Sequence, residues 1–133
     1  MEYGKLGNTD IEVSKLCVGC MSFGKAGTMH DWTLDEAESE NVIKHALDLG
    51  YNFFDTSNGY SAGTSEEYLG KALKKNVARN QVVIASKVYF NEGRLSRQAI
   101  MREIDGHHFL RWRIIIICFT ERMRENCYQF VSK

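Results

Sequence analysis

Hydrophobic residues in this chain follow two patterns that alternate along the sequence. Short apolar runs begin near residues 16, 52 and 82, and after each run apolar residues recur three and four positions apart. The runs are typical of buried strands, and the three-and-four spacing is typical of amphipathic helices. A strand and a helix repeating every roughly 30 to 37 residues predict a parallel sheet with right-handed crossovers, as a closed barrel or as an open doubly wound sheet.

Three helices are expected from their start signals. A Ser or Thr followed three residues later by Glu can form a capping box at a helix N-terminus. Thr33 with Glu36, and Thr64 with Glu67, have this spacing, and Ser96 is expected to begin the third helix. The apolar faces predicted for the first two helices are Val42, Ile43, Ala46 and Leu47, and Tyr68, Leu69, Ala72 and Leu73.

The two ends of the chain depart from this rhythm. Residues 2–14 are predicted to form a small β-hairpin with its turn at 7–10, because apolar and polar residues alternate on either side of a turn sequence. From 106 to 133 there is no clear helical stripe, although 114–117 is expected to form a buried strand. The sequence therefore divides into a regular part, 1–105, and a divergent tail, 106–133.

Composition narrows the class of protein. A length of 133 residues with 44% hydrophobic and 26% charged residues predicts one globular domain. The formal net charge of +0 gives no basic field for nucleic acid or an anionic membrane. No apolar run approaches the ~20 residues of a membrane span. Four cysteines without an apolar leader segment favour a reducing cytoplasm over a disulfide framework.

Candidate chemistry lies where two predicted strands end. Asp55 closes the run 52–55, Lys87 closes the run 82–87, and Tyr60 follows Asp55 in a loop rich in Gly and Ser. In an α/β barrel the C-terminal ends of the strands form the active face. A phenol there can donate a proton to a carbonyl oxygen. Taken singly, Asp55 would be interpreted as a turn cap and the other two as surface residues, so the hypothesis rests on the trio.

A few residues could suggest a metal site or a nucleic-acid site, but simpler interpretations of them are favoured. Cys17 and Cys20 form a C-x-x-C, but a zinc site needs a second pair of ligands, and Cys17 is expected to be buried in a strand. We therefore predict no metal site. The histidines at 107–108 are interpreted as polar loop, and the arginines at 111 and 113 as a solvated face.

Several segments of the sequence resemble segments of the aldo-keto reductase family, and they occur in the same order along the chain as in that family. FFDTSNGY at 53–60 and ASK at 85–87 contain the trio described above. LGNTDIEVSKL at 6–16 resembles the opening hairpin of the family, GCMSFG at 19–24 its first βα loop, and SEEYLGKAL at 65–73 its second helix. The resemblance covers residues 1 to about 105, and the combination is specific.

The resemblance implies a fold and a reaction. It implies an α/β fold, the N-terminal half of a (β/α)₈ TIM barrel preceded by a β-hairpin, and transfer of hydride between NADP(H) and a small-molecule carbonyl or alcohol. It assigns Tyr60 as proton donor, Lys87 as the cation that makes the phenol a stronger acid, and Asp55 as the carboxylate that supports the lysine. The cofactor-binding residues that it implies are Cys20, Met21, Ser22 and Asp55.

The tail departs from the family. The resemblance leads us to expect a catalytic His near Arg122, but the family pattern ends at Asp105. We interpret this abrupt loss of pattern as a shift of reading frame followed by a stop. A (β/α)₈ barrel needs ~250 residues, and this chain has about half that number. Two hypotheses follow: an NADP(H)-dependent oxidoreductase present as a truncated chain, or a catalytically inactive half-barrel fragment. In either case we expect self-association through an open sheet edge.

Overall fold

A parallel sheet with consecutive strand order is the centre of the molecule. The computed structural model describes residues 1–88, 92–106 and 114–118. Within these residues, the sheet has four strands in the order β3-β4-β5-β6, each parallel to its neighbour. The strands are β3 (Val18–Gly19), β4 (Phe53–Asp55), β5 (Val83–Val88) and β6 (Ile114–Cys118). Each new strand joins the same side of the sheet, as in a barrel, whereas a doubly wound sheet reverses from a central strand.

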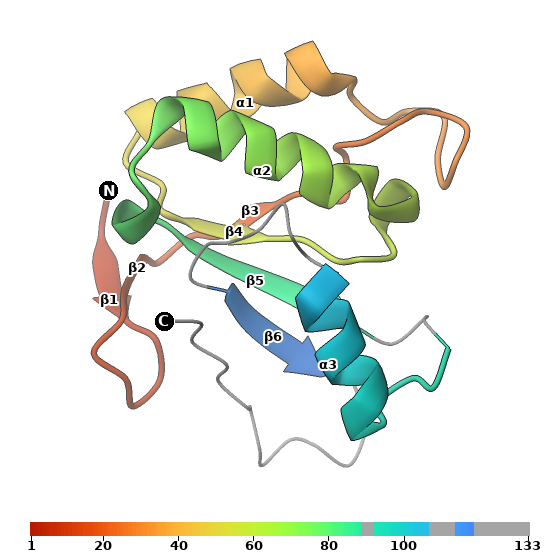
Figure 1. Ribbon diagram of the computed structural model, residues 1–133. Helices are drawn as coiled ribbons and strands as arrows, with labels where there is room; N and C mark the ends of the chain where they lie inside the picture. Colours follow the sequence, from red (N-terminus) through yellow and green to blue (C-terminus); the bar gives the residue numbers. More distant parts are fainter. Residues whose placement is uncertain (89–91, 107–113, 119–133) are drawn as a thin grey trace.

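Helices follow the strands as the alternating pattern predicts. They are α1 (Glu36–Asp48), α2 (Thr64–Asn76) and α3 (Arg97–Gly106), with short 3₁₀ turns η1 (Tyr60–Gly63) and η2 (Arg79–Gln81). Figure 1 shows α1 and α2 side by side over one face of the sheet. Their inward faces meet the central strands in one core of buried side chains, which includes Ile43, Ala46, Phe54, Leu69, Leu73 and Ile84. This core fixes the sheet whose C-terminal edge holds the candidate site.

The N-terminal hairpin forms as predicted. β1 (Tyr3–Lys5) pairs antiparallel with β2 (Glu12–Ser14), and the Leu6 amide donates to the Ile11 carbonyl at 2.9 Å across the turn. The side chain of Asn52, just before β4, accepts from the Ser14 amide at 2.6 Å and donates to the Glu12 carbonyl at 3.1 Å. The hairpin is therefore tied to the N-terminal end of the sheet, opposite the edge that carries Asp55.

The first helix begins later than predicted. Its N-cap is Asp35, which forms a capping box with Glu38, so the expected box between Thr33 and Glu36 is wrong. The reason is that the preceding backbone is occupied in pairing. Leu34 donates to the Ser22 carbonyl at 2.7 Å, and its carbonyl accepts from Gly24 at 3.1 Å. The chain stays extended until this pairing ends.

The other two helices begin where the sequence predicts, but with one different cap. α2 starts at Thr64 after Gly63, with no side-chain cap, so the predicted capping box with Glu67 does not form. The Ser96 hydroxyl accepts from the Ala99 amide at 3.2 Å and caps α3 as expected. On α1, Val42 is 43% exposed, so its assignment to the buried face is wrong.

The tail is described only in part. The strand expected at 114–117 forms as β6, parallel to β5, with Ile116 opposite Ser86. Its predicted burial, the histidines at 107–108, the arginines at 111 and 113, and residues 119–133 lie outside what the structure describes. The proposed boundary at 105/106 therefore stays a prediction. In the described part of the chain, none of the helices combines the length and the apolar character needed to cross a membrane.

Candidate active site

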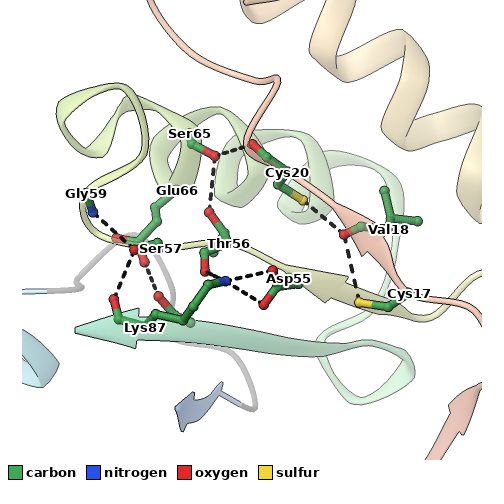
Figure 2. A network of polar contacts seen from close by, with 11 residues as sticks. Cys17, Val18, Cys20, Asp55, Thr56, Ser57, Gly59, Ser65, Glu66 and Lys87 are labelled. Atoms are coloured by element: carbon green, nitrogen blue, oxygen red, sulfur yellow. Dashed lines mark hydrogen bonds and ion pairs between the residues drawn. The ribbon is translucent and has the colours of Figure 1, made fainter. Parts of the chain in front are cut away.

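An ion pair joins the ends of β4 and β5. Asp55 is the last residue of β4 and is aligned with Ala85, so Lys87 lies two residues further along the neighbouring strand. The Lys87 Nζ donates to both Asp55 carboxylate oxygens at 2.6 Å and to the Thr56 carbonyl at 2.7 Å (Figure 2). The two side chains are 16% and 33% exposed for Lys87 and Asp55. These contacts hold the ammonium in one place at the C-terminal edge of the sheet.

Tyr60 lies against this ammonium. The Lys87 Nζ is 5.0 Å from the centroid of the Tyr60 ring, within the range of a cation–π interaction. The loop that carries Tyr60 is anchored to the same strand, because the Asn58 amide and the Ser57 hydroxyl each donate to the Lys87 carbonyl at 3.3 Å. The structure therefore brings together all three predicted catalytic residues, Asp55, Tyr60 and Lys87.

A chain of buried hydroxyls connects this trio to the first βα loop. The Ser65 hydroxyl at the start of α2 donates to the Cys20 carbonyl at 2.7 Å and lies 3.1 Å from the Thr56 hydroxyl. The Cys20 amide donates to the Asp55 carbonyl at 2.8 Å. Figure 2 shows the Ser65 side chain between Cys20 and Thr56, with a dashed line to each. The backbone of Cys20, one of the residues predicted to face the cofactor, is thus held directly against the Asp55 strand end.

The remaining predicted cofactor residues follow Cys20 in the same loop. Met21 is 39% exposed, which leaves part of its apolar side chain uncovered. Ser22 is half-buried, and its carbonyl accepts the Leu34 amide. Cys20 itself is fully buried and its amide is already hydrogen-bonded. Of the three predicted cofactor residues in this loop, Met21 and Ser22 therefore have surface left for a ligand.

The two cysteines have different surroundings from those expected. Cys17 lies before β3 and is exposed, so the prediction that it is buried in a strand is wrong; Cys20 is the buried one. Loss of hydration, with the nearby Asp55 charge as a second cause, raises the pKa of Cys17 to about 11. Burial raises the pKa of the Cys20 thiol further. Both thiols are therefore protonated at neutral pH and are poor nucleophiles or ligands. Across 1–88, 92–106 and 114–118, His, Cys, Asp and Glu side chains form no cluster of three that could hold a metal.

Sequence reasoning missed a buried carboxylate next to the site. Glu66 on α2 is 6% exposed and accepts a hydrogen bond from the hydroxyl of Ser86, the residue before Lys87. A signal was present, because Glu66 is three residues before the core residue Leu69 and therefore shares its inward face. The contact attaches the end of β5 to α2 and so supports the strand from which Lys87 projects.

Comparisons of the sequence with a family model and with known proteins agree on one family. The model of the Aldo/keto reductase family matches residues 15–107. The chain is 47% identical over 91 residues to versiconal hemiacetal acetate reductase of Aspergillus parasiticus, which covers 68% of this chain and 26% of that protein. It is 42% identical over 87 residues to the aldo-keto reductase YhdN of Bacillus subtilis, covering 65% and 25% of the two chains. The chain thus spans about a quarter of the length of these relatives.

Solved structures give the same result for the fold. The holo form of the aldo-keto reductase AKR11C1 from Bacillus halodurans superposes with a TM-score of 0.68 at 29% identity, over 87% of this chain and 40% of that one. The hairpin and the consecutive parallel strands described above are therefore the first part of a TIM barrel, as predicted from the sequence.

Proposed function

Because this chain belongs to the aldo/keto reductase family, we propose that it carries the proton-donating part of an NADP(H)-dependent oxidoreductase acting on a carbonyl or alcohol. The observation that supports this most directly is the triple contact of the Lys87 ammonium. It bonds both Asp55 oxygens and lies against the ring of Tyr60. A phenol with a fixed cation beside it is suited to general acid catalysis.

Tyr60 is the proposed proton donor to the carbonyl oxygen. When the phenol has given up its proton, the Lys87 ammonium stabilises the phenolate that remains, because an opposite charge close by favours the ionised form. Asp55 orients the ammonium through its two 2.6 Å contacts. Tyr60 thus donates the proton, Lys87 stabilises the phenolate, and Asp55 orients Lys87.

The first βα loop fits a nicotinamide cofactor. Met21 presents a partly uncovered apolar side chain, and the loop is held against Asp55 through Cys20, so a flat ring placed on it would lie near the proton donor. When bound, the nicotinamide supplies or accepts the hydride. We propose that Met21 and Ser22 contact it, with Cys20 and Asp55 behind them.

The test is carbonyl reduction by a polypeptide of these 133 residues. Purified protein is mixed with NADPH and a reactive aromatic aldehyde, and the absorbance of the reduced nicotinamide is followed. Tyr60→Phe is expected to lower turnover by ~10²–10⁴-fold, the usual contribution of general acid catalysis. Tyr51→Phe is the matched control, since Tyr51 packs against the core before β4 begins, away from the site. Turnover that persists in Tyr60→Phe would remove Tyr60 from the mechanism.

A second candidate is an inactive partial barrel. The chain spans 26% of versiconal hemiacetal acetate reductase, and in the described residues β3 and β6 form the two ends of the sheet instead of pairing with each other. A sheet with open edges invites pairing with another chain. We propose that such a polypeptide would self-associate through β6, and the absence of any NADPH oxidation in the assay above would favour this candidate.

The cellular setting is proposed on separate grounds. The sequence has four cysteines, and Cys17 and Cys20 are free thiols in the structure although they are three residues apart. Proteins of reducing compartments keep thiols in this state. We therefore propose a cytoplasmic location.

A further inference from the structure

Gly24, at the end of the first βα loop, touches the residue that follows Tyr60. A Cβ built on Gly24 would lie 2.4 Å from the Ser61 Cβ, 2.6 Å from its Oγ and 2.9 Å from the Thr64 Oγ1. Carbon atoms in proteins normally approach to ~3.5–4.0 Å. Any side chain at Gly24 would therefore displace Ser61 by about 1 Å. The φ of Gly24, 134°, independently favours glycine.

The Ser61 segment depends on such contacts for its shape. Ser61 (φ 47°) and Ala62 (φ 54°) are both left-handed without being glycine, an unfavourable conformation that persists only when the surroundings enforce it. Ser61 is fully buried, and its hydroxyl has no hydrogen-bond partner in the described part of the chain. Packing, and not a side-chain hydrogen bond, therefore holds the Ser61 side chain in place, and Gly24 is one of its packing neighbours.

A second connection joins the same two loops. The Lys25 amide, next to Gly24, donates to the Thr64 hydroxyl at 2.9 Å, and that hydroxyl donates to the Ser61 carbonyl at 2.7 Å. The backbone next to Gly24 is thus linked to the Ser61 carbonyl through the Thr64 hydroxyl. A shift of one loop is transmitted to the other without a flexible segment between them.

We propose that Gly24 is a positioning residue for Tyr60. Its missing side chain leaves the space in which Ser61 packs, and this packing keeps the ring of Tyr60 against Lys87. The inference rests on the proposed function, since it links the loop suggested for the cofactor to the suggested proton donor. A displacement of ~1 Å at a reacting group can lower the rate by ~10²-fold. Loss of the contact between Gly24 and Ser61 would therefore slow the proposed reaction if it moved Tyr60 by this much.

The experiment reads the position of Tyr60 without needing turnover. The full 133-residue chain is labelled with 3-fluorotyrosine, and its six tyrosine signals are recorded by ¹⁹F NMR. Tyr60→Phe identifies the Tyr60 signal, and Lys87→Met shows where that signal lies when the ammonium is removed. Gly24→Ala is expected to move the Tyr60 signal while the signals of Tyr3 and Tyr51 stay in place.

Two further variants separate positioning from general strain. Gly27→Ala is the matched control: Gly27 also has a positive φ of 77°, but its nearest contact would be 4.0 Å away on Asp31. It should leave the Tyr60 signal unchanged. In Gly24→Ala/Ser61→Gly the new methyl group occupies the space left by the Ser61 side chain, so the Tyr60 signal should return toward its original position.

The proposal is overturned if Gly24→Ala leaves the Tyr60 signal in place, if Gly27→Ala moves it equally, or if the double variant does not restore it. Should Gly24→Ala unfold, with the signals of Tyr3, Tyr51 and Tyr68 collapsing together with that of Tyr60, the pair Ser61→Gly and Ala62→Gly decides. Both relieve left-handed backbone, but only Ser61→Gly removes the contact, so only it should move the Tyr60 signal; equal effects would reject the proposal. The NMR signals do not require catalysis. The NMR result therefore stands even if the aldehyde assay shows that Tyr60 is not the proton donor.

Discussion

Lys87 reaches from β5 to Asp55 on β4 and places its Nζ 2.6 Å from each carboxylate oxygen. The contact joins two strands at the edge where the candidate chemistry lies. Because Lys87 is only 16% exposed, water can do little to replace the partner if one member is removed. The pair should therefore contribute both to stability and to the electrostatics of the site.

Removing one partner of this pair should destabilise the fold. Asp55→Asn and Lys87→Met are each expected to lower the free energy of unfolding by about 1–3 kcal/mol, because each leaves a partly buried charge without its oppositely charged partner. Urea unfolding at low protein concentration measures this loss. Lys71→Met is the control: its pair with Glu36 is 46% and 51% exposed, and exposed pairs contribute about 1 kcal/mol or less. Equal losses at Lys71 and Lys87 would contradict the prediction.

Cys17 should report the charges of the site. Its pKa, raised from 9.0 to about 11, predicts alkylation at pH 8 about 100-fold slower than that of an ordinary thiol, increasing about tenfold per pH unit up to pH ~11. The Asp55 charge raises this pKa and the Lys87 charge lowers it. Asp55→Asn should therefore accelerate the reaction and Lys87→Met should slow it.

Peptide mass spectrometry after timed iodoacetamide treatment separates Cys17 from the other cysteines. Cys20, which is fully buried, serves as the internal control and should react only in denaturant. Labelling of Cys17 that is fast at pH 7, or that is indifferent to both substitutions, would show that the thiol does not sense the ion pair.

The contact between Ser86 and Glu66 should support the end of β5. Ser86→Ala removes a donor to a buried carboxylate and is expected to cost about 1–3 kcal/mol of unfolding free energy, more than the loss of a neutral hydrogen bond. Ser39→Ala is the matched control, since the buried Ser39 hydroxyl donates to a neutral carbonyl, that of Leu34, at 3.2 Å. If the urea midpoints fall equally in the two variants, the bond to Glu66 contributes no more to stability than a bond to a neutral carbonyl.

Binding of NADPH to the 133-residue polypeptide should be weak. The residues predicted from the sequence to bind the cofactor, Cys20, Met21, Ser22 and Asp55, include no Lys or Arg, so they offer phosphates no charge-assisted hydrogen bonds. Fluorescence titration should give a dissociation constant well above micromolar, and reduced nicotinamide mononucleotide should bind about as tightly as NADPH. Micromolar affinity for NADPH, lost in the mononucleotide, would contradict this prediction.

The same polypeptide should associate through β6. Light scattering after gel filtration is expected to show species larger than a monomer, and Ile115→Lys/Ile116→Lys should reduce them, because successive residues face opposite sides of a strand and edge lysines oppose pairing. Val42→Lys, at an exposed apolar position on α1, is the control and should leave association unchanged. A monodisperse monomer of the original chain would reject the prediction.

Local patterns were sufficient for the order of elements. The apolar runs at 52–55 and 82–87 became adjacent parallel strands. The helix start at Ser96 was right because its cap depends on residues close in sequence, and α2 begins at Thr64 as predicted although its expected capping box does not form. The spacing of Asp55, Tyr60 and Lys87 was also sufficient to expect their meeting, since parallel strands place their C-terminal ends at one edge. Their catalytic roles stay a prediction.

Contacts between distant segments decided the rest. The cap of α1 moved to Asp35 because Leu34 pairs with the first βα loop, and Cys17, which lies just before β3, is exposed. The approach of Gly24 to Ser61 and the bond from Ser86 to Glu66 join residues 37 and 20 positions apart in the chain. Hydrophobic periodicity is a property of neighbours along the chain, whereas burial, hydrogen-bond partners and steric fit depend on which segments meet when the sheet and helices pack.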